Sequence, residues 1–307
     1  MNSPDDKLWQ AMRFDHKVIF SEGQSYEDLF TKIMRDRYAD FRQVKPNGRD
    51  GDWKNDGFIP SSGKCFQVYA PEDAELADAR GAEKVANDFK GLLEKWGKVA
   101  PVKLFRFAAN DKFRGLGPKC EAALAQLRKD HPSIDIASFL AHELREEFLQ
   151  TGELLRYELF GSKPPDVTSE DLETRCFQQV LDHLLQQNAP VDFGSVAINP
   201  DFEAKLQFNN LSEPVATHLR SANYDGSAYL VTFFKFKSRE REKLAHQFRR
   251  LYRETSDQVG DVPSKENVVF LEILAKATPV ADARVQHAAL VLMSYFFEVC
   301  DIFEPPR

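Results

Sequence analysis

The segment GDWKNDGFIPSSGKCFQVYAPE, residues 51–72, gathers acidic and amide side chains around a short turn-rich stretch. Asp52 and Asp56 bracket Lys54, and Gln67 follows within an alternating run. Carboxylate and carbonyl-type oxygens are the ligands that Mg²⁺ prefers, so these residues are suited to holding a divalent ion. Asp, Asn and Gly are also the residues that favour polar turns. The segment therefore has two interpretations, a metal site of the kind nucleases use or a surface turn.

The elements around this segment indicate an α/β module. Ser25 can cap a helix whose apolar side chains recur at helical spacing. Short apolar runs on either side of Gly63 indicate two strands joined by a tight turn. The expected strands are 41–45, 57–60, 64–70 and 102–108, and the expected helices are 25–38, 80–96, 120–132 and 134–151.

The second half is predicted to be mainly helical. Two prolines follow a glycine in GSKPPDVTSED, residues 161–171, and indicate a break between domains. The helices expected after it lie within 171–187, 239–255, 267–277 and 283–303. The last of these is apolar on nearly all sides over residues 288–297, which predicts a central buried helix. Residues 1–20 carry little pattern and are expected to form a lead-in.

Composition limits the classes of function. The net charge of −7 and the pI near 5.6 argue against a stand-alone protein that grips DNA through a broad basic surface. No apolar run reaches the length of a membrane helix, and the first residues lack the pattern of a secretory signal. The four cysteines are far apart, which predicts free thiols and a cytoplasmic protein.

The predicted order α-β-β-β-α-β resembles the core of the restriction-endonuclease-like fold, the PD-(D/E)xK group. GDWKNDG followed by FQVY is similar to the Mrr-like branch, in which an Asp-Gly turn leads to a strand carrying Gln-x-Lys. The resemblance implies that Asp56 and Gln67 hold Mg²⁺ or Mn²⁺ from adjacent strands. It also implies a lysine two residues after Gln67, on the same strand face, that stabilises charge during phosphodiester hydrolysis.

One position departs from that pattern, because Tyr69 stands where the lysine is expected. Lys54 or Lys64 is the replacement that we weigh for the missing positive charge. Glu27, on the first predicted helix, is a further candidate metal ligand, as a first-helix acid is in some relatives. Without such a replacement, the fold would be a degenerate one that does not cleave.

GRDGDWKNDGF, FQVYAPE and the C-terminal YFFEVCDIFEPP are similar to modules of bacterial conflict systems, particularly the ABC-three-component type. This resemblance implies an antiphage defence component that works with an ATPase and accessory proteins. We expect a restriction-endonuclease-like α/β domain over residues 20–160 and a helical partner-binding domain over 165–307. The favoured function is metal-dependent DNA hydrolysis, and the alternative is a non-catalytic adaptor that bridges the ATPase to another effector.

Two further segments have open interpretations. FRGLGPK, residues 113–119, favours a loop, and contact with a phosphate is the alternative. The segment 234–254 interleaves basic and aromatic residues, and its possible nucleic-acid contacts are Lys235, Lys237, Arg249 and Arg250. A charged helix face paired with nearby acids is the favoured interpretation of this segment.

Overall fold

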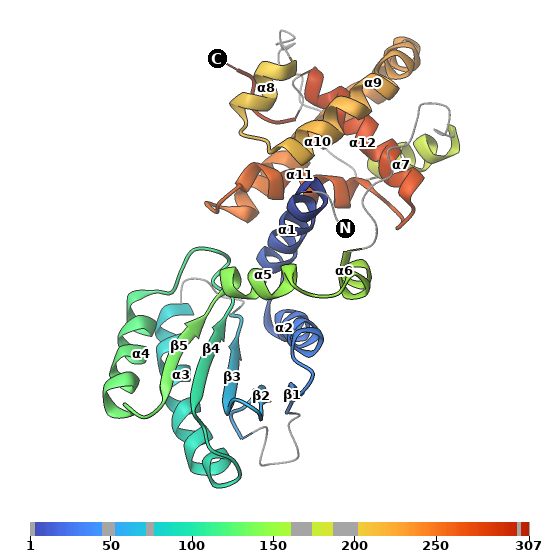
Figure 1. Cartoon of the computed structure of the whole chain (residues 1–307). Helices are drawn as coiled ribbons and strands as arrows, with labels where there is room; N and C mark the ends of the chain where they lie inside the picture. The colour runs from blue at the N-terminus through green and yellow to red at the C-terminus, as the bar shows by residue number, and fades with distance from the viewer. Residues whose placement is uncertain are drawn as a thin grey trace. The chain divides into compact units, whose positions relative to one another are not determined.

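The computed structural model describes residues 4–44, 53–71, 77–160, 174–186, 202–299 and 302–306. Contacts within the chain define two compact units (Figure 1). Residues 17–161 form one, called the α/β unit below, and residues 1–16 with 162–307 form the other, called the helical unit. The predicted break at 161–171 falls outside the described residues.

The described part of the α/β unit contains a mixed sheet in the order β1-β2-β3-β4-β5. The first two pairs of strands are antiparallel, and the pairs β3–β4 and β4–β5 are parallel. This confirms the expected mixed sheet and the pairing of its two central predicted strands. The elements are α2 (Gly23–Arg37), β1 (Arg42–Gln43), β2 (Gly57–Ile59), β3 (Lys64–Tyr69), α3 (Ala77–Lys95), η2 (Trp96–Lys98), β4 (Leu104–Ala109), α4 (Pro118–Asp130), β5 (Asp135–Phe139), α5 (Ala141–Leu149) and α6 (Glu153–Phe160).

The single helix predicted over 134–151 is wrong in its first part. Residues 135–139 form β5, and α5 begins only at Ala141. Ile136 is buried and lies opposite Phe105 of β4. Pairing with a neighbouring strand decides the conformation here, and the local sequence propensity carries no information about that pairing.

The two faces of the sheet are covered by different helices, because side chains alternate along each strand. Cys65 of β3 and Phe105 and Phe107 of β4 pack in one core with side chains of α3 and α4. Phe66 points to the opposite face, where its ring lies 5.3 Å from that of Phe30 on α2. Gln67 and Tyr69 therefore share the face of α3, while Lys64 shares the face of α2.

The helical unit includes most of α1 (Pro4–Ile19), so the described part of the lead-in predicted for residues 1–20 is mainly a helix. Trp9 packs edge-on against His218 at 4.7 Å between ring centroids, and Phe14 is fully buried. The remaining elements are α7 (Thr174–Gln186), α8 (Phe202–Phe208), α9 (Glu213–Lys235), α10 (Ser238–Val259), α11 (Lys265–Ala277) and α12 (Ala283–Glu298).

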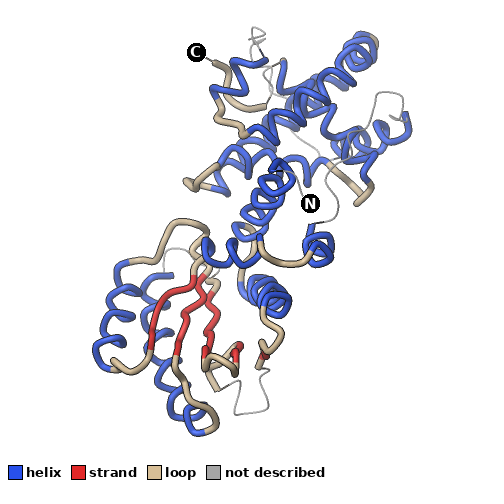
Figure 2. Tube along the Cα trace, viewed as in Figure 1, coloured by secondary structure: helices blue, strands red, loops and turns tan. Residues whose placement is uncertain are grey.

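Helix α12 is the buried centre predicted for the C-terminal half. Its residues from His287 to Phe297 are all buried, and Leu292 has no exposed area. The strands of the described chain lie in the α/β unit, and the helical unit shows helices and loops (Figure 2). Among the described residues, none of the helices has the length and apolarity needed to cross a membrane.

Candidate functional site

Asp56 and Gln67 lie side by side on neighbouring strands of the α/β unit. The antiparallel register pairs Gly57 of β2 with Phe66 of β3, which places Asp56 opposite Gln67. Asp56 Oδ2 accepts a 2.6 Å hydrogen bond from Gln67 Nε2 and another of 2.6 Å from the backbone N–H of Val68. Both side chains are buried, with 8% of Asp56 and 3% of Gln67 exposed. The structure brings together Asp56 and Gln67, two of the three residues that the metal-site prediction names.

The Asp56 carboxylate also has a structural role. Strand β2 begins at Gly57, opposite Phe66, so Val68 of β3 lies beyond the paired residues of β2. Asp56 Oδ2 supplies the acceptor for the Val68 N–H. A buried N–H left without an acceptor costs about 1–3 kcal/mol. A substitution that tests the site must therefore keep an acceptor at this position.

Several buried polar atoms of this pair and of the preceding residue in sequence have no hydrogen-bond partner in the described structure. They are Gln67 Oε1 and both side-chain amide atoms of Asn55, whose side chain is completely buried. Buried polar atoms are normally satisfied by protein, water or an ion. The oxygens of Asp56 and Gln67 are hard donors of the type that Mg²⁺ and Mn²⁺ accept. This set of residues therefore fits a small divalent cation.

Lys54 is held by an acid of α3 that our sequence analysis did not single out. This acid is Asp88. The Lys54 ammonium lies 3.0 Å from Asp88 Oδ1, and the Lys84 ammonium lies 2.6 Å from Asp88 Oδ2. Only 4% of the Asp88 side chain is exposed. The signal was present in the sequence, since Val85 and Phe89 recur at helical spacing and place Asp88 beside the face that meets β3.

Lys64 and Glu27 do not join Asp56 and Gln67. Lys64 points to the other face of the sheet, where its ammonium lies 5.9 Å from the centre of the Tyr38 ring. Glu27 belongs to α2, the helix that packs on that same opposite face. Of the lysines considered from sequence, Lys54 is therefore the one on the side of Gln67.

Tyr69 occupies the third position of the motif with an aromatic ring. The ring stacks on Phe107 with 5.6 Å between centroids and an interplanar angle of 25°. A Cβ added at Gly81 of α3 would approach the Tyr69 ring to 3.0 Å, so a glycine keeps room for it. The position carries no positive charge, and packing fixes its side chain.

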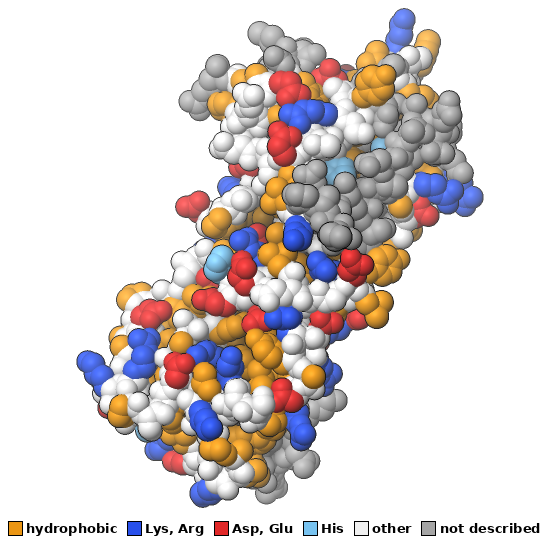
Figure 3. Space-filling view, in the orientation of Figure 1, with side chains coloured by type: hydrophobic (Ala, Val, Ile, Leu, Met, Phe, Trp, Pro, Cys, Tyr) orange, Lys and Arg blue, Asp and Glu red, His pale blue; other side chains and the backbone are white. Residues whose placement is uncertain are grey.

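The basic segment, residues 234–254, runs from the end of α9 through most of α10 in the helical unit. The Lys237 ammonium lies 4.7 Å from the centre of the Phe233 ring, and Arg250 Nε lies 3.8 Å from a Glu254 oxygen. Lys235 is exposed and Arg249 is half-buried. On the face drawn in Figure 3, basic and acidic side chains are interspersed. Nucleic-acid contact by these residues stays a prediction.

The described parts of the chain hold no group of three or more His, Cys, Asp and Glu side chains that could bind a metal ion. Among the described residues named here, Asp56 supplies the carboxylate of the candidate cation site and Gln67 supplies an amide oxygen. Such a donor set carries little negative charge, which predicts weak affinity unless the substrate adds its own oxygens.

One family model matches the C-terminal part of the chain. Residues 175–304 match the model of C-terminal domain 10 of the ABC-three component (ABC-3C) systems. No curated protein and no solved structure matches the chain. The match supports the resemblance to ABC-three-component systems, and it lies within the helical unit. The restriction-endonuclease resemblance of the α/β unit stays a prediction.

Proposed function

We propose that this chain is a component of an ABC-three-component conflict system whose α/β unit hydrolyses nucleic-acid phosphodiesters with a divalent ion. One observation carries the proposal: Asp56 and Gln67 converge from adjacent strands, and Gln67 Oε1 is buried there without a partner. The helical unit, which contains the family match, binds the other proteins of the complex.

Asp56 and Gln67 share one role in this proposal. The Asp56 carboxylate and the Gln67 amide oxygen together hold the ion. Gln67 now turns its Nε2 toward Asp56, so binding the ion requires the amide to rotate and exchanges one hydrogen bond for a metal contact. A bound divalent ion would polarise a phosphate oxygen and lower the pKa of a water molecule.

Lys54 and Lys84 supply the positive charge in place of the lysine that Tyr69 replaces. Both ammonium groups converge on Asp88, on the α3 side of the sheet. Asp88 positions them and neutralises part of their charge in the absence of substrate. A phosphate that arrives beside Gln67 competes with Asp88 for these two cations.

Tyr69 favours a second candidate function, that of a non-catalytic adaptor. Its ring is fixed on Phe107 and supplies no positive charge to the site. In this case the α/β unit retains the fold as a scaffold, and the chain bridges the ATPase and another effector. Tyr69→Lys then restores the missing cation and is expected to create or raise cleavage.

Calorimetric titration with Mn²⁺ separates these functions. The test variant is Asp56→Asn, which keeps an oxygen acceptor for the Val68 N–H but removes the charge. The matched control is Asp130→Asn, at the exposed end of α4 in the same unit. Wild type and control are expected to bind Mn²⁺ and to cleave plasmid DNA in the presence of the cognate partners. Asp56→Asn is expected to do neither.

Mn²⁺ affinity that is the same in wild type and in Asp56→Asn would contradict the proposed site. No Mn²⁺ binding by the wild type, with or without the partners and DNA, would favour the adaptor. Loss of cleavage in Lys54→Ala or Lys84→Ala, with Mn²⁺ binding intact, would assign the positive charge.

A further inference from the structure

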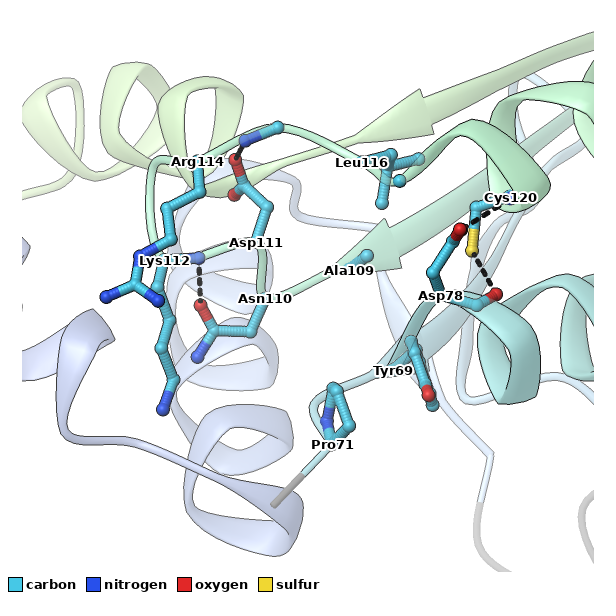
Figure 4. A pocket seen from close by; sticks show the side chains of 12 residues that line it. Tyr69, Pro71, Asp78, Ala109, Asn110, Asp111, Lys112, Arg114, Leu116 and Cys120 are labelled. Atoms are coloured by element: carbon cyan, nitrogen blue, oxygen red, sulfur yellow. Dashed lines mark hydrogen bonds between the residues drawn. The ribbon is translucent and has the colours of Figure 1, made fainter. Parts of the chain in front are cut away.

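A second site lies at the carboxyl ends of β3 and β4. A cavity of about 250 Å³ opens there, next to the β4–α4 loop and the first turn of α4 (Figure 4). Ligands of parallel α/β sheets commonly bind in this position, outside the carboxyl ends of the strands. Gln67 and Tyr69 share a strand face, so the cavity begins about 7 Å along β3 from the candidate metal site.

The floor of the cavity is apolar and includes an aromatic ring. Tyr69, Pro71, Ala109 and Leu116 line it. Stacking on Phe107 fixes the Tyr69 ring, so little side-chain freedom is lost when a ligand packs on it. A flat apolar group is the kind of ligand that this floor accommodates.

Charged side chains line both sides of the cavity, an acid at one side and two cations with the acid Asp111 at the other. Asp78 and Cys120 lie at one side, and the stretch from Asn110 to Arg114 forms the other (Figure 4). Burial opposes ionisation of Asp78, but the backbone N–H groups of Cys120 and Lys119 outweigh it and hold the Asp78 pKa below its ordinary value. Lys112 and Arg114 are the cations of the opposite side, and the Lys112 ammonium lies 2.6 Å from Glu22.

Hydrogen bonds hold the loop around the cavity in place. Asn110 donates from Nδ2 to the carbonyls of Val18 and Ser21 and accepts the N–H of Lys112. Asp111 accepts the N–H groups of Gly115 and Ala141. The walls are therefore formed before a ligand arrives, which lowers the free-energy cost of binding.

We propose that this cavity binds one nucleotide unit. The base packs on the floor beside Tyr69, its amino group donates to Asp78, and its phosphate faces Arg114 and Lys112. A nucleotide carries hydrogen-bond donors at one end, a flat ring between and an anion at the other end, which matches the order of groups in the cavity. The site goes beyond the proposed hydrolysis, since it needs no metal.

The acceptor at Asp78 predicts a base preference. Guanine presents two adjacent N–H donors to a carboxylate, and adenine and cytosine present an amino group, whereas uracil has no amino group. Guanosine monophosphate is therefore expected to bind more tightly than uridine monophosphate. The ligand has two possible sources, a free nucleotide or one unit of a single strand.

Equilibrium binding of fluorescent nucleotides in EDTA tests the site, because EDTA removes any metal contribution. Ligands are the nucleoside monophosphates and short single-stranded oligonucleotides, at up to about 1 mM. The main variant is Leu116→Trp, which fills the cavity from a half-buried loop position. It is expected to weaken binding at least about tenfold, the equivalent of 1.4 kcal/mol. Its melting temperature shows whether it folds.

A second pair of variants tests the positive charge. Arg114→Glu changes a residue of the cavity lining, and the control Arg128→Glu changes a residue in the last turn of α4. Arg114→Glu is expected to weaken binding and to reduce its dependence on salt, and Arg128→Glu is expected to change neither. This pair keeps the test decisive if Leu116→Trp does not fold. Tighter binding of oligonucleotides than of monophosphates identifies a strand as the source, and equal binding identifies a free nucleotide.

Several results would overturn the proposal. They are the absence of binding by any nucleotide or oligonucleotide, equal binding by wild type and folded Leu116→Trp, and tighter binding of uridine than of guanosine monophosphate. Asp56→Asn is expected to bind nucleotides like the wild type. A protein that keeps nucleotide binding but never binds Mn²⁺ would refute the proposed hydrolysis and leave the nucleotide site in place.

Discussion

Gln67 and Asp56 are joined by a 2.6 Å hydrogen bond in which a neutral amide donates to a buried carboxylate. This bond gives opposite predictions for Gln67→Glu with and without metal. In EDTA, two buried carboxylates face each other, and we expect a loss of about 2–4 kcal/mol in the free energy of unfolding. Mn²⁺ should restore the loss, because a second carboxylate raises the affinity of the site for a cation.

Melting curves of Gln67→Glu in EDTA and in Mn²⁺ measure this difference. Gln126→Glu is the matched control, since Gln126 also donates to an aspartate, Asp130, at 2.9 Å, but on an exposed helix surface. The control is expected to change little in either condition. Equal destabilisation of Gln67→Glu in both conditions would mean that Asp56 and Gln67 form a structural pair only.

Lys205 is expected to anchor the C-terminal segment to α8. Its side chain is fully buried, and Nζ donates to the carbonyl oxygens of Phe297 at 2.6 Å and Ile302 at 2.7 Å. Lys205→Met keeps the length and the apolar stem but removes the charged donor from both carbonyls, at a cost of about 2–4 kcal/mol.

Amide hydrogen exchange of residues 302–306 and urea unfolding test the Lys205 prediction. Lys235→Met, on the exposed end of α9, is the control and is expected to be neutral. Unchanged exchange in Lys205→Met would show that Asn209, which contacts the Glu304 backbone, holds the segment without the lysine.

Gly226 permits the close approach of α9 and α12. A Cβ at this position would overlap the side chain of Val291, which is almost completely buried. Gly226→Ala gains about 1 kcal/mol of helix propensity, yet we expect a net loss of about 1–3 kcal/mol from overpacking. Ser221→Ala, at an exposed position of α9, is the control for propensity. Thermal unfolding that shows Gly226→Ala to be stabilised would refute the close packing.

Glu272 predicts a pH dependence of stability in the helical unit. Burial alone would raise its pKa, but the hydrogen bond from His16 Nε2 and the charges of His16 and Lys276 outweigh burial and hold the pKa below the ordinary 4.5. Because the folded-state pKa is the lower one, the stabilisation is fully present above about pH 4.5. It is lost as pH falls through the folded-state value.

Urea unfolding of wild type and Glu272→Gln from pH 7 down to about pH 3 measures this contribution. The variant is expected to be less stable near neutral pH, and the two curves should converge in acid. Glu254→Gln is the control, since its carboxylate is exposed and lies 3.8 Å from Arg250. A difference that stays constant over the range would exclude titration of Glu272 as its source.

Local sequence patterns predicted much of the fold. Alternation in CFQVYA located β3, the turn at Gly63 located its pairing with β2, and the all-round apolar run located α12. Helix α1 and strand β5 were missed because their conformation depends on distant partners. Trp9 packs on His218, and Ile136 lies opposite Phe105, and neither partner is visible in a local window.

The candidate site was also predictable in part from local sequence patterns. The spacing of Asp56 and Gln67 around a hairpin was enough to place them together. Which lysine faces Asp56 and Gln67 depends on which residues of β3 share a face and on the position of α3. Only the structure shows that Lys64 points away. Asp88 was missed because a Lys-x-x-x-Asp pair on a helix usually marks a solvated surface, whereas this acid is 3% exposed.

The helical unit is assembled from two separate stretches of the chain, residues 1–16 and residues 162–307. The family match begins only at residue 175, yet Trp9 and Phe14 are buried side chains of that unit. Exchange of the C-terminal region between proteins by a single crossover near residue 161 would therefore leave its first helix behind. In evolution, or in a chimaera made in the laboratory, the helical unit is inherited intact only when both of these stretches are transferred together.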